Sequence, residues 1–482
     1  MTRYIAKYSL SIALLCGILP QSPAAAETKD NDAQPVYQET LRPQFHYTVK
    51  KGWINDPCGL VHYKGQYHLF NDHNPFGNTM PGTIDAKTPS RWSHAVSPDL
   101  VHWTEMPIAV MPDEKLGAIF SGSGVVDHDN TSGLASGDEK PLVLVYTLAG
   151  RPFSQGISYS NDSGKTWTPY AKNPVVPNQG LMTSERDPRV FWHEPTKRWV
   201  MVLYVKRGIA RFFTSEDLKT WTHTSDFKDD GFHECPDLFQ LPLDGDKDDM
   251  KWILYDAKFK YYIGTFDGKE FKAESGPFRG DFGRNFYAAQ TWTNTPGKTI
   301  QIAWMNGGRY PGMPFNQQQS FPCELTLETL PEGVRICRRP IDGIKALRTN
   351  THSFADKTLN PVNSLLKGIE GDLFEIEAEI EPLDAATFGL SIRGEKINYT
   401  MGEKKLSALG AAAEVELIDG RMTLHVLVDR ASIEVFANDG RLSMTSCFIP
   451  EAEDKSLAIY SGCGQIKVIS LKVHELKSIW PE

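Results

Sequence analysis

One short turn sequence recurs along the first half of this chain of 482 residues. Residues Ser97–Thr104 read SPDLVHWT, residues Ser215–Thr222 read SEDLKTWT, and a form one residue longer, Ser160–Thr168, lies between them. Each copy has the composition of a tight hairpin whose Trp packs beneath a Ser/Asp turn. A turn that returns every 50 to 65 residues, with several strands in each interval, is typical of a β-propeller made of four-stranded blades.

The segments between these turns are predicted to be strands. Helical periodicity is scarce, and the clearest runs of Val, Ile, Tyr, Phe and Trp, each bounded by turn residues, are Tyr67–Phe70, Leu142–Tyr146, Trp199–Tyr204 and Trp252–Tyr255. With 39 Gly, 31 Pro and an aromatic share of 11%, the composition is that of a turn-rich globular protein. We therefore expect an all-β fold.

A different pattern begins near Phe354. Residues Phe374–Ile380 alternate Glu with apolar side chains, so one face of that strand is predicted to be wet and the other buried. The alternation returns in Met422–Val428 and Ser432–Phe436, as is typical of a β-sandwich. We predict a boundary between Ile344 and Ser353, with a propeller domain over 33–345 and a sandwich domain over 352–482.

The first residues predict export. Arg3 and Lys7 precede an apolar run, Tyr8–Pro20, and Ala24–Ala26 supply the small residues that a signal peptidase needs. We expect residues 1–26 to be a signal peptide cleaved near Ala26, and the mature protein to be periplasmic or extracellular. A membrane anchor is disfavoured because the apolar run is shorter than the ~20 residues that cross a bilayer, and no later segment qualifies.

Charge and cysteine content exclude several classes of protein. The formal net charge is −9 and no basic tract stands out, which argues against a nucleic-acid partner. The six cysteines after residue 26 are too sparse for a disulfide framework, and no CxxC pair suggests zinc. The acidic run Asp244–Asp249 lacks the glutamate and the ligand spacing of a calcium loop. We expect a monomer without a metal or a cofactor.

Four motifs place an acid or a hydroxyl beside residues that form turns. They are Trp53–Gly59 (WINDPCG), Phe120–Gly124 (FSGSG), Arg186–Pro188 (RDP) and Glu234–Asp237 (ECPD). Asp56, Ser121, Asp187, Glu234 and Tyr287 follow one another at intervals of 65, 66, 47 and 53 residues, about one blade each. Five inner strands would then direct five motifs toward one axis, which predicts five blades.

Converging carboxyl groups with aromatic neighbours suit glycoside hydrolysis. One acid can protonate the leaving oxygen while a second attacks the anomeric carbon or activates water. Each motif alone has a simpler explanation, because Asn-Asp-Pro and Asp-Pro are common turns and Arg186 with Asp187 could be a surface ion pair. The blade-like spacing favours the catalytic interpretation.

These motifs resemble those of glycoside hydrolase family 32, which contains levanases, inulinases and invertases. The resemblance extends over nearly the whole chain after residue 26, and its further motifs are His73–Phe76, Phe286–Gln290, Ile302–Met305 and Asp429–Phe436. It implies a five-bladed propeller that carries the active site, a C-terminal β-sandwich, and retaining hydrolysis of β-fructofuranosides. Gly312–Phe315 is more similar to exo-acting levanases than to invertases, so we expect terminal fructose to be released from levan or inulin ahead of sucrose.

The resemblance also implies roles for individual residues. Asp56 would be the nucleophile, Glu234 the general acid/base, and Asp187 the stabiliser of the transition state. Retention requires the two reacting carboxyl groups to lie ~5 to 5.5 Å apart, so we expect the Asp56 anion to raise the pKa of Glu234. The remaining substrate-binding residues are expected to be Asn55, Asp72, Phe120, Ser121, Arg186, Tyr287 and Trp304.

The sequence also departs from the family pattern. Cys58 stands where the family usually has Asn, Asp72 where it has Gln, and Ser93 where it has Gly. The usual Trp-Gly after the loop that begins at His73 is missing, and 78–90 is predicted to be an altered loop. An added carboxyl group at Asp72 would either bind another hydroxyl or perturb the titration of the neighbouring acids.

Three other interpretations remain open from the sequence. Ser160–Thr168 also matches the aspartate box of sialidases, but a sialidase needs several converging arginines and only Arg186 lies in a candidate motif. A non-catalytic glycan-binding propeller would keep the same fold without turnover. Cys235 beside Glu234 suggests a thiol mechanism, although a buried packing role is favoured.

Overall fold

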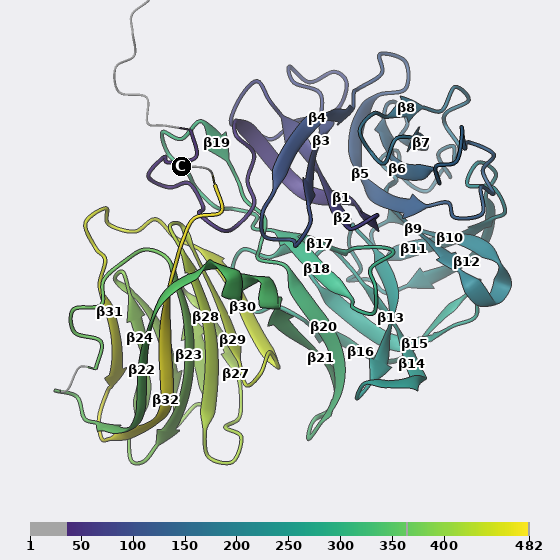
Figure 1. Ribbon diagram of the computed structural model, residues 1–482. Coiled ribbons are helices and arrows are strands. Elements are labelled where there is room, and N and C mark those ends of the chain that lie inside the picture. The colour runs from purple at the N-terminus through teal and green to yellow at the C-terminus, as the bar shows by residue number, and fades with distance from the viewer. Residues whose placement is uncertain (1–35, 363–364, 481–482) are drawn as a thin grey trace, which may run out of the picture. The chain divides into compact units, whose positions relative to one another are not determined.

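The computed structural model describes residues 36–362 and 365–480, so the predicted signal peptide lies outside the described residues (Figure 1). Within these ranges the chain is built from strands, with two short 3-10 helices, Glu194–Thr196 and Asp342–Leu347. Neither helix in this part of the chain is long or apolar enough for a membrane span. The prediction of an all-β fold is confirmed.

The first domain is a five-bladed propeller, as predicted. Each blade is an antiparallel sheet of four strands, and the first strands of neighbouring blades lie side by side, β1 with β5, β5 with β9 and β17 with β1. The strands are β1 (Gly52–Tyr63), β2 (Gln66–Asn74), β3 (Arg91–Ser97) and β4 (Thr104–Val110); β5 (Ala118–Val126), β6 (Leu142–Ala149), β7 (Ser154–Ser160) and β8 (Thr168–Pro169); β9 (Arg186–His193), β10 (Arg198–Lys206), β11 (Ile209–Ser215) and β12 (Thr222–Lys228); β13 (Asp237–Leu243), β14 (Asp246–Tyr255), β15 (Lys260–Phe266) and β16 (Phe271–Arg279); and β17 (Tyr287–Thr291), β18 (Ile300–Trp304), β20 (Cys323–Leu330) and β21 (Gly333–Pro340).

Short parallel pairings connect neighbouring blades, and one of them is the isolated pair Val61 with Thr293. β19 (Phe315–Asn316) runs parallel to the start of β1, and a single parallel pair, Leu243 with Leu327, joins β13 to β20. The first strands β1 and β5 can approach closely because β5 has a glycine, Gly124, at the contact. A Cβ atom at Gly124 would lie 2.5 Å from the Gly59 carbonyl oxygen of β1. Gly124 of the FSGSG motif therefore serves the packing of two inner strands, whereas Gly122 makes room for the backbone of β6 at Val145.

The recurring Ser/Asp turn connects the third and fourth strands of the first three blades. It begins where β3, β7 and β11 end, and finishes where β4, β8 and β12 begin. In blade one, Asp99 Oδ1 accepts hydrogen bonds from the backbone N–H groups of Val101 and His102. In blade three, Asp217 Oδ1 accepts them from Lys219 and Thr220. The carboxylate thus satisfies backbone donors that the tight turn leaves without a strand partner.

The second domain is a sandwich of two antiparallel sheets. One sheet has six strands in the order β22-β32-β23-β28-β29-β30 and the other has five in the order β27-β26-β25-β24-β31. Their bounds are β22 (Arg348–Leu359), β23 (Phe374–Pro382), β24 (Thr387–Ile392), β25 (Glu395–Thr400), β26 (Lys405–Ala408), β27 (Ala411–Glu414), β28 (Met422–Asp429), β29 (Ser432–Ala437), β30 (Leu442–Cys447), β31 (Leu457–Ser461) and β32 (Ile466–Leu476). Inward-facing side chains such as Ile376, Phe388 and Val426 form one apolar core. The limits at 345 and 352 stay predictions.

Buried charges connect the two domains. His46, in the segment before β1, lies with Nδ1 2.8 Å from Asp429 Oδ2 and with Nε2 2.8 Å from Glu434 Oε2. Arg338 of β21 reaches Asp281 at 3.0 Å and Glu434 at 3.4 Å. All five side chains are almost fully buried. We call these five residues the interface cluster.

Candidate active site

All ten predicted site residues line one cavity, most of them on the first strands of the blades, with Asp72 on β2, Trp304 on β18 and Glu234 just before β13. This cavity has a volume of about 330 Å³ and lies where the inner strands begin. Ten of its lining residues are Asn55, Asp56, Asp72, Phe120, Ser121, Arg186, Asp187, Glu234, Tyr287 and Trp304. The spacing of the motifs therefore corresponds to the passage of the chain from one blade to the next.

Asp56 lies at an irregular position of β1, where the pairing with β2 shifts between Ile54 and Pro57. Its Oδ2 accepts a hydrogen bond of 2.6 Å from Ser121 Oγ, and its Oδ1 lies 3.3 Å from Asn55 Nδ2. Burial raises the pKa of Asp56, and the charge of Glu234 adds to this, whereas the bonds from Ser121 and Asn55 oppose it. The donors hold the carboxylate in one orientation.

Asp187 and Glu234 both have left-handed backbone conformations, with φ of 65° and 55°. This conformation costs free energy for residues other than glycine, and such strain is concentrated at functional sites. Cys235 N donates to Asp187 Oδ2 at 3.1 Å, while Arg186 Nε lies 3.8 Å from the same oxygen. Burial outweighs the Arg186 charge and raises the pKa of Asp187 to about 7.

Glu234 accepts hydrogen bonds from two side chains of the cavity wall. Arg186 Nη2 donates to Oε1, and Tyr287 OH donates to Oε2 at 2.6 Å. His233 Nε2 lies 3.4 Å from Oε1. Burial alone would raise the pKa of Glu234, but the Arg186 charge and the Tyr287 hydroxyl, with His233, lower it below its ordinary value.

The predicted pKa direction for Glu234 is therefore wrong for this structure. The prediction considered only the Asp56 anion across the cavity, which disfavours a second charge. Arg186 contacts Glu234 directly, and a cation in contact outweighs a more distant anion. Asp56, rather than Glu234, has the raised pKa.

Five further residues line the cavity and were not among the predicted site residues. They are Met80, Pro81, Ser90, Phe153 and Ser184. The first three belong to the segment 78–90 that departs from the family pattern, and the Met80 side chain is 59% exposed. Phe153 packs edge-on against Phe120, with ring centroids 5.5 Å apart. The altered loop was recognisable in the sequence, but its contribution to the wall was not.

The cavity argues against two of the alternatives. Arg186 is the single arginine among the residues that line it, whereas a sialidase needs several. The Cys235 thiol lies 3.4 Å from Asp56 Oδ2 and 3.5 Å from Asp187 Oδ2. Burial and these carboxylates raise the pKa of Cys235 well above its ordinary value, so the thiolate needed for nucleophilic attack is disfavoured.

Arg189 of β9 lies two residues beyond Asp187 and joins three inner strands, because it contacts both β13 and β17. Its Nε lies 2.8 Å from Asp237 Oδ1, and its Nη1 donates to the Thr291 carbonyl oxygen at 2.8 Å. Neither charged side chain of this pair is more than 3% exposed. A second cavity, of about 310 Å³ and lined partly by Arg189, Phe191 and Trp252, lies toward the other ends of the inner strands.

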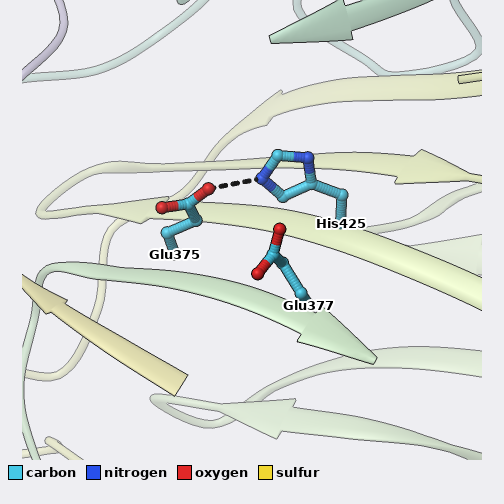
Figure 2. Close-up of side chains that lie close together, drawn as sticks. All are labelled: Glu375, Glu377 and His425. Atoms are coloured by element: carbon cyan, nitrogen blue, oxygen red, sulfur yellow. Dashed lines mark hydrogen bonds and ion pairs between the residues drawn. The ribbon is translucent and has the colours of Figure 1, made fainter. Parts of the chain in front are cut away.

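A cluster on the sandwich has the composition of a metal site (Figure 2). Glu375 and Glu377 of β23 and His425 of β28 each bring one ligand atom within 4.8 Å of the others. Arg348 occupies the same place, with Nε 2.6 Å from Glu375 Oε2 and Nη2 3.6 Å from Glu377 Oε1. Burial alone would raise the pKa of Glu375, but His425 and Arg348 lower it to about 2. Because the guanidinium already pairs with both acids, we assign the cluster to ion pairing within the sheet.

Comparison with known proteins gives matches over both domains. The model of the glycosyl hydrolases family 32 N-terminal domain matches residues 46–340, and that of the family 32 C-terminal domain matches residues 343–475. A levanase of Bacillus subtilis (strain 168) is 38% identical over 98% of this chain and 76% of its own length. An extracellular exo-inulinase of Aspergillus ficuum is 29% identical over 92% of this chain and 96% of its own length. The crystal structure of an exo-inulinase from Aspergillus awamori superposes with a TM-score of 0.82, at 26% identity, over 92% of this chain and 100% of that chain.

Proposed function

Because this chain belongs to glycoside hydrolase family 32, we propose that it is an exported fructan hydrolase. It releases terminal fructose from levan or inulin, and less readily from sucrose, through a fructosyl-enzyme intermediate. The observation that carries the proposal is the convergence of Asp56, Asp187 and Glu234 on one cavity of about 330 Å³. The similarity to proteins described as levanase and exo-inulinase supports fructan as the substrate.

Asp56 is the proposed nucleophile. Its carboxylate attacks the anomeric carbon of the terminal fructosyl unit, the glycosidic bond breaks, and water later hydrolyses the fructosyl ester. Ser121 Oγ, at 2.6 Å, and Asn55 Nδ2, at 3.3 Å, each donate to one carboxylate oxygen. These donors favour the anion that the attack requires and fix its direction.

Glu234 is the proposed general acid/base. It must carry a proton when it meets the leaving oxygen, whereas Arg186 and Tyr287 favour its anion in the ligand-free cavity. A bound sugar excludes water and offers hydroxyl groups to Arg186 and Tyr287, and both effects raise the pKa of Glu234. Binding of the substrate would therefore protonate Glu234 before the leaving oxygen departs.

Asp187 is the proposed transition-state stabiliser. Its carboxylate accepts hydrogen bonds from ring hydroxyls while positive charge develops on the furanose, and such preorganised charge is a large catalytic contribution. Phe120 and Trp304 supply apolar faces to the cavity, and Trp304 is held by a bond of 2.9 Å from its Nε1 to Gln317 Oε1. Flat apolar faces and directed polar groups together suit a sugar.

Export is proposed on two grounds. The sequence pattern of residues 1–26 predicts a cleaved signal peptide, and the similar Aspergillus inulinase is described as extracellular. Polymeric fructans are too large to enter a cell by diffusion, which makes an exported enzyme chemically reasonable.

The test is the release of reducing sugar from levan, inulin and sucrose, with chromatography of the products. The purified wild type is compared with Glu234→Gln, and Glu332→Gln, an exposed acid outside the cavity, serves as the matched control. We expect fructose as the sole product from the wild type and the control, and a loss of at least ~10² in kcat for Glu234→Gln. Oligosaccharide products would refute exo action, and binding of fructan without any release would support the non-catalytic interpretation.

A further inference from the structure

Asp72 is a buried acid, and one of its hydrogen-bond contacts has no obvious proton donor. It lies on β2, is 4% exposed, and accepts a hydrogen bond of 3.0 Å at Oδ1 from Trp92 Nε1. Its Oδ2 lies 3.1 Å from Ser121 Oγ and 3.2 Å from Asn55 Nδ2. Ser121 and Asn55 are the same two residues that hold Asp56.

Ser121 cannot donate a hydrogen bond to both Asp56 and Asp72. A serine hydroxyl has one proton but can also accept hydrogen bonds. Its contact with Asp56 is the shorter one, 2.6 Å against 3.1 Å for Asp72, so the proton belongs to the Asp56 contact. The contact between Ser121 Oγ and Asp72 Oδ2 then needs a proton supplied by Asp72. The two Asn55 amide protons satisfy one oxygen of each acid without conflict.

The electrostatic surroundings also favour a neutral Asp72. Asp56 and Cys58 of β1 and Asp187 of β9 face it, together with the uncharged Ser121 and Trp92. The nearest cation of the cavity, Arg186, is bound to Ser184 and to Glu234. Burial, and then the charges of Asp56 and Asp187, raise the pKa of Asp72 well above its ordinary value.

We propose that Asp72 is a positioning residue that works as a neutral carboxylic acid, donating its proton to Ser121 Oγ so that the Ser121 hydroxyl is directed at Asp56. The inference rests on the proposed function, in which Asp56 is the nucleophile. An ionised Asp72 would compete with Asp56 for the single Ser121 proton and would place a second anion beside the reacting carboxylate. The neutral acid instead supports one orientation and one ionisation state of Asp56.

The first test needs no substrate and counts the charge by capillary electrophoresis near pH 7. Asp72→Asn replaces the neutral acid by an uncharged amide of the same shape, whose oxygen can accept from Trp92 while its Nδ2 donates to Ser121; only the hydrogen bond from Asn55 is lost. If the Asp56–Asp72 pair holds one proton, Asp72→Asn leaves the mobility unchanged, whereas Asp138→Asn, which removes an exposed carboxylate, shifts it by one charge. A one-charge shift for Asp72→Asn overturns the proposal even if no fructan is ever hydrolysed.

The second test locates the proton through the pH profile of kcat/KM. If Asp72 is neutral, Asp72→Asn keeps the acid limb, which Asp56 and Asp187 set, within about half a pH unit of the wild type. If the proton instead lies on Asp56, removing the Asp72 anion shifts the acid limb of kcat/KM to lower pH by about one pH unit or more. Activity below neutral pH then rises. That result overturns the proposal.

Asp72→Ala completes the comparison because it removes the donor as well as the acid. We expect its kcat to be lower than that of Asp72→Asn by on the order of tenfold, since the hydrogen bond that directs Ser121 is lost. Equal kcat values for the two variants would show that Ser121 needs no donor at this position and would also overturn the proposal. Failure of the wild type to release any sugar would refute the proposed function, while the electrophoretic result would still stand.

Discussion

His46 should make the stability of this protein depend on pH in the alkaline range. Both of its ring nitrogens contact carboxylate oxygens, which requires both to be donors and therefore the imidazolium cation. Burial alone would lower the pKa of His46, but hydrogen bonds to Asp429 and Glu434 raise it to about 9 from an ordinary value of 6.5. A group whose pKa is raised on folding stabilises the fold fully at pH values below its pKa in the unfolded chain. This stabilisation is lost as the pH rises through the pKa of the group in the folded protein.

The magnitude follows from the size of the shift. A rise of the His46 pKa from 6.5 to about 9 corresponds to roughly 3 kcal/mol of stabilisation, at about 1.36 kcal/mol per pKa unit. We therefore expect the difference in unfolding free energy between the wild type and His46→Gln to be largest near pH 6. It should shrink by roughly 3 kcal/mol on going to about pH 9.5, with the steepest change between these pKa values.

The assay is urea unfolding followed by tryptophan fluorescence at several pH values. His102→Gln is the matched control, because His102 also pairs with an acid, Asp99, but is exposed, and exposed pairs contribute little. Groups that titrate in both proteins cancel in the difference between wild type and variant. A difference that stays constant from about pH 6 to about pH 9.5 would show that His46 is neutral in the folded protein and would refute the reasoning.

Four further outcomes are expected. Tyr287→Phe removes a donor to Glu234 and so raises its pKa, which should move the alkaline limb of kcat/KM to higher pH; an unmoved limb would contradict the assignment of that limb to Glu234. Asp187→Asn should lower kcat by about 10²–10³, in single-turnover as well as steady-state assays. Met80→Ala should raise KM for levan more than for sucrose, because Met80 is an exposed part of the cavity wall. A chelator should leave the thermal midpoint unchanged, since Arg348 already neutralises Glu375; a lowered midpoint would reveal a structural metal.

The sequence predicted the features that repeat with the blades. Asp56, Ser121, Asp187, Glu234 and Tyr287 could be placed together because each blade returns the chain to the centre, so spacing along the chain translates into proximity. The β-sandwich was predictable because polar and apolar residues alternate along a strand wherever one face of its sheet is exposed to solvent. Both are properties of the backbone path, which local patterns control.

What could not be predicted depends on side-chain directions and on distant partners. The pKa of Glu234 depends on whether Arg186 reaches it or only its neighbour Asp187, and spacing does not reveal that direction. His46 contacts Glu434, which lies 388 positions further along the chain, and no local sequence pattern predicts such a contact. The wall formed by Met80 comes from an irregular loop, which has no period to recognise.

The Arg189–Asp237 pair at the centre of the propeller has a kinetic consequence. The pair is buried where β9, β13 and β17 come together, with Arg189 two residues beyond Asp187 of the cavity wall. Under the proposed function, a fructosyl unit then enters and leaves through the same mouth. The released sugar cannot move onward while the polymer slides through, and the shortened chain has to withdraw before the next end is admitted. Under the proposed function, turnover is therefore distributive rather than processive, and free fructose competes with incoming chain ends for the same space.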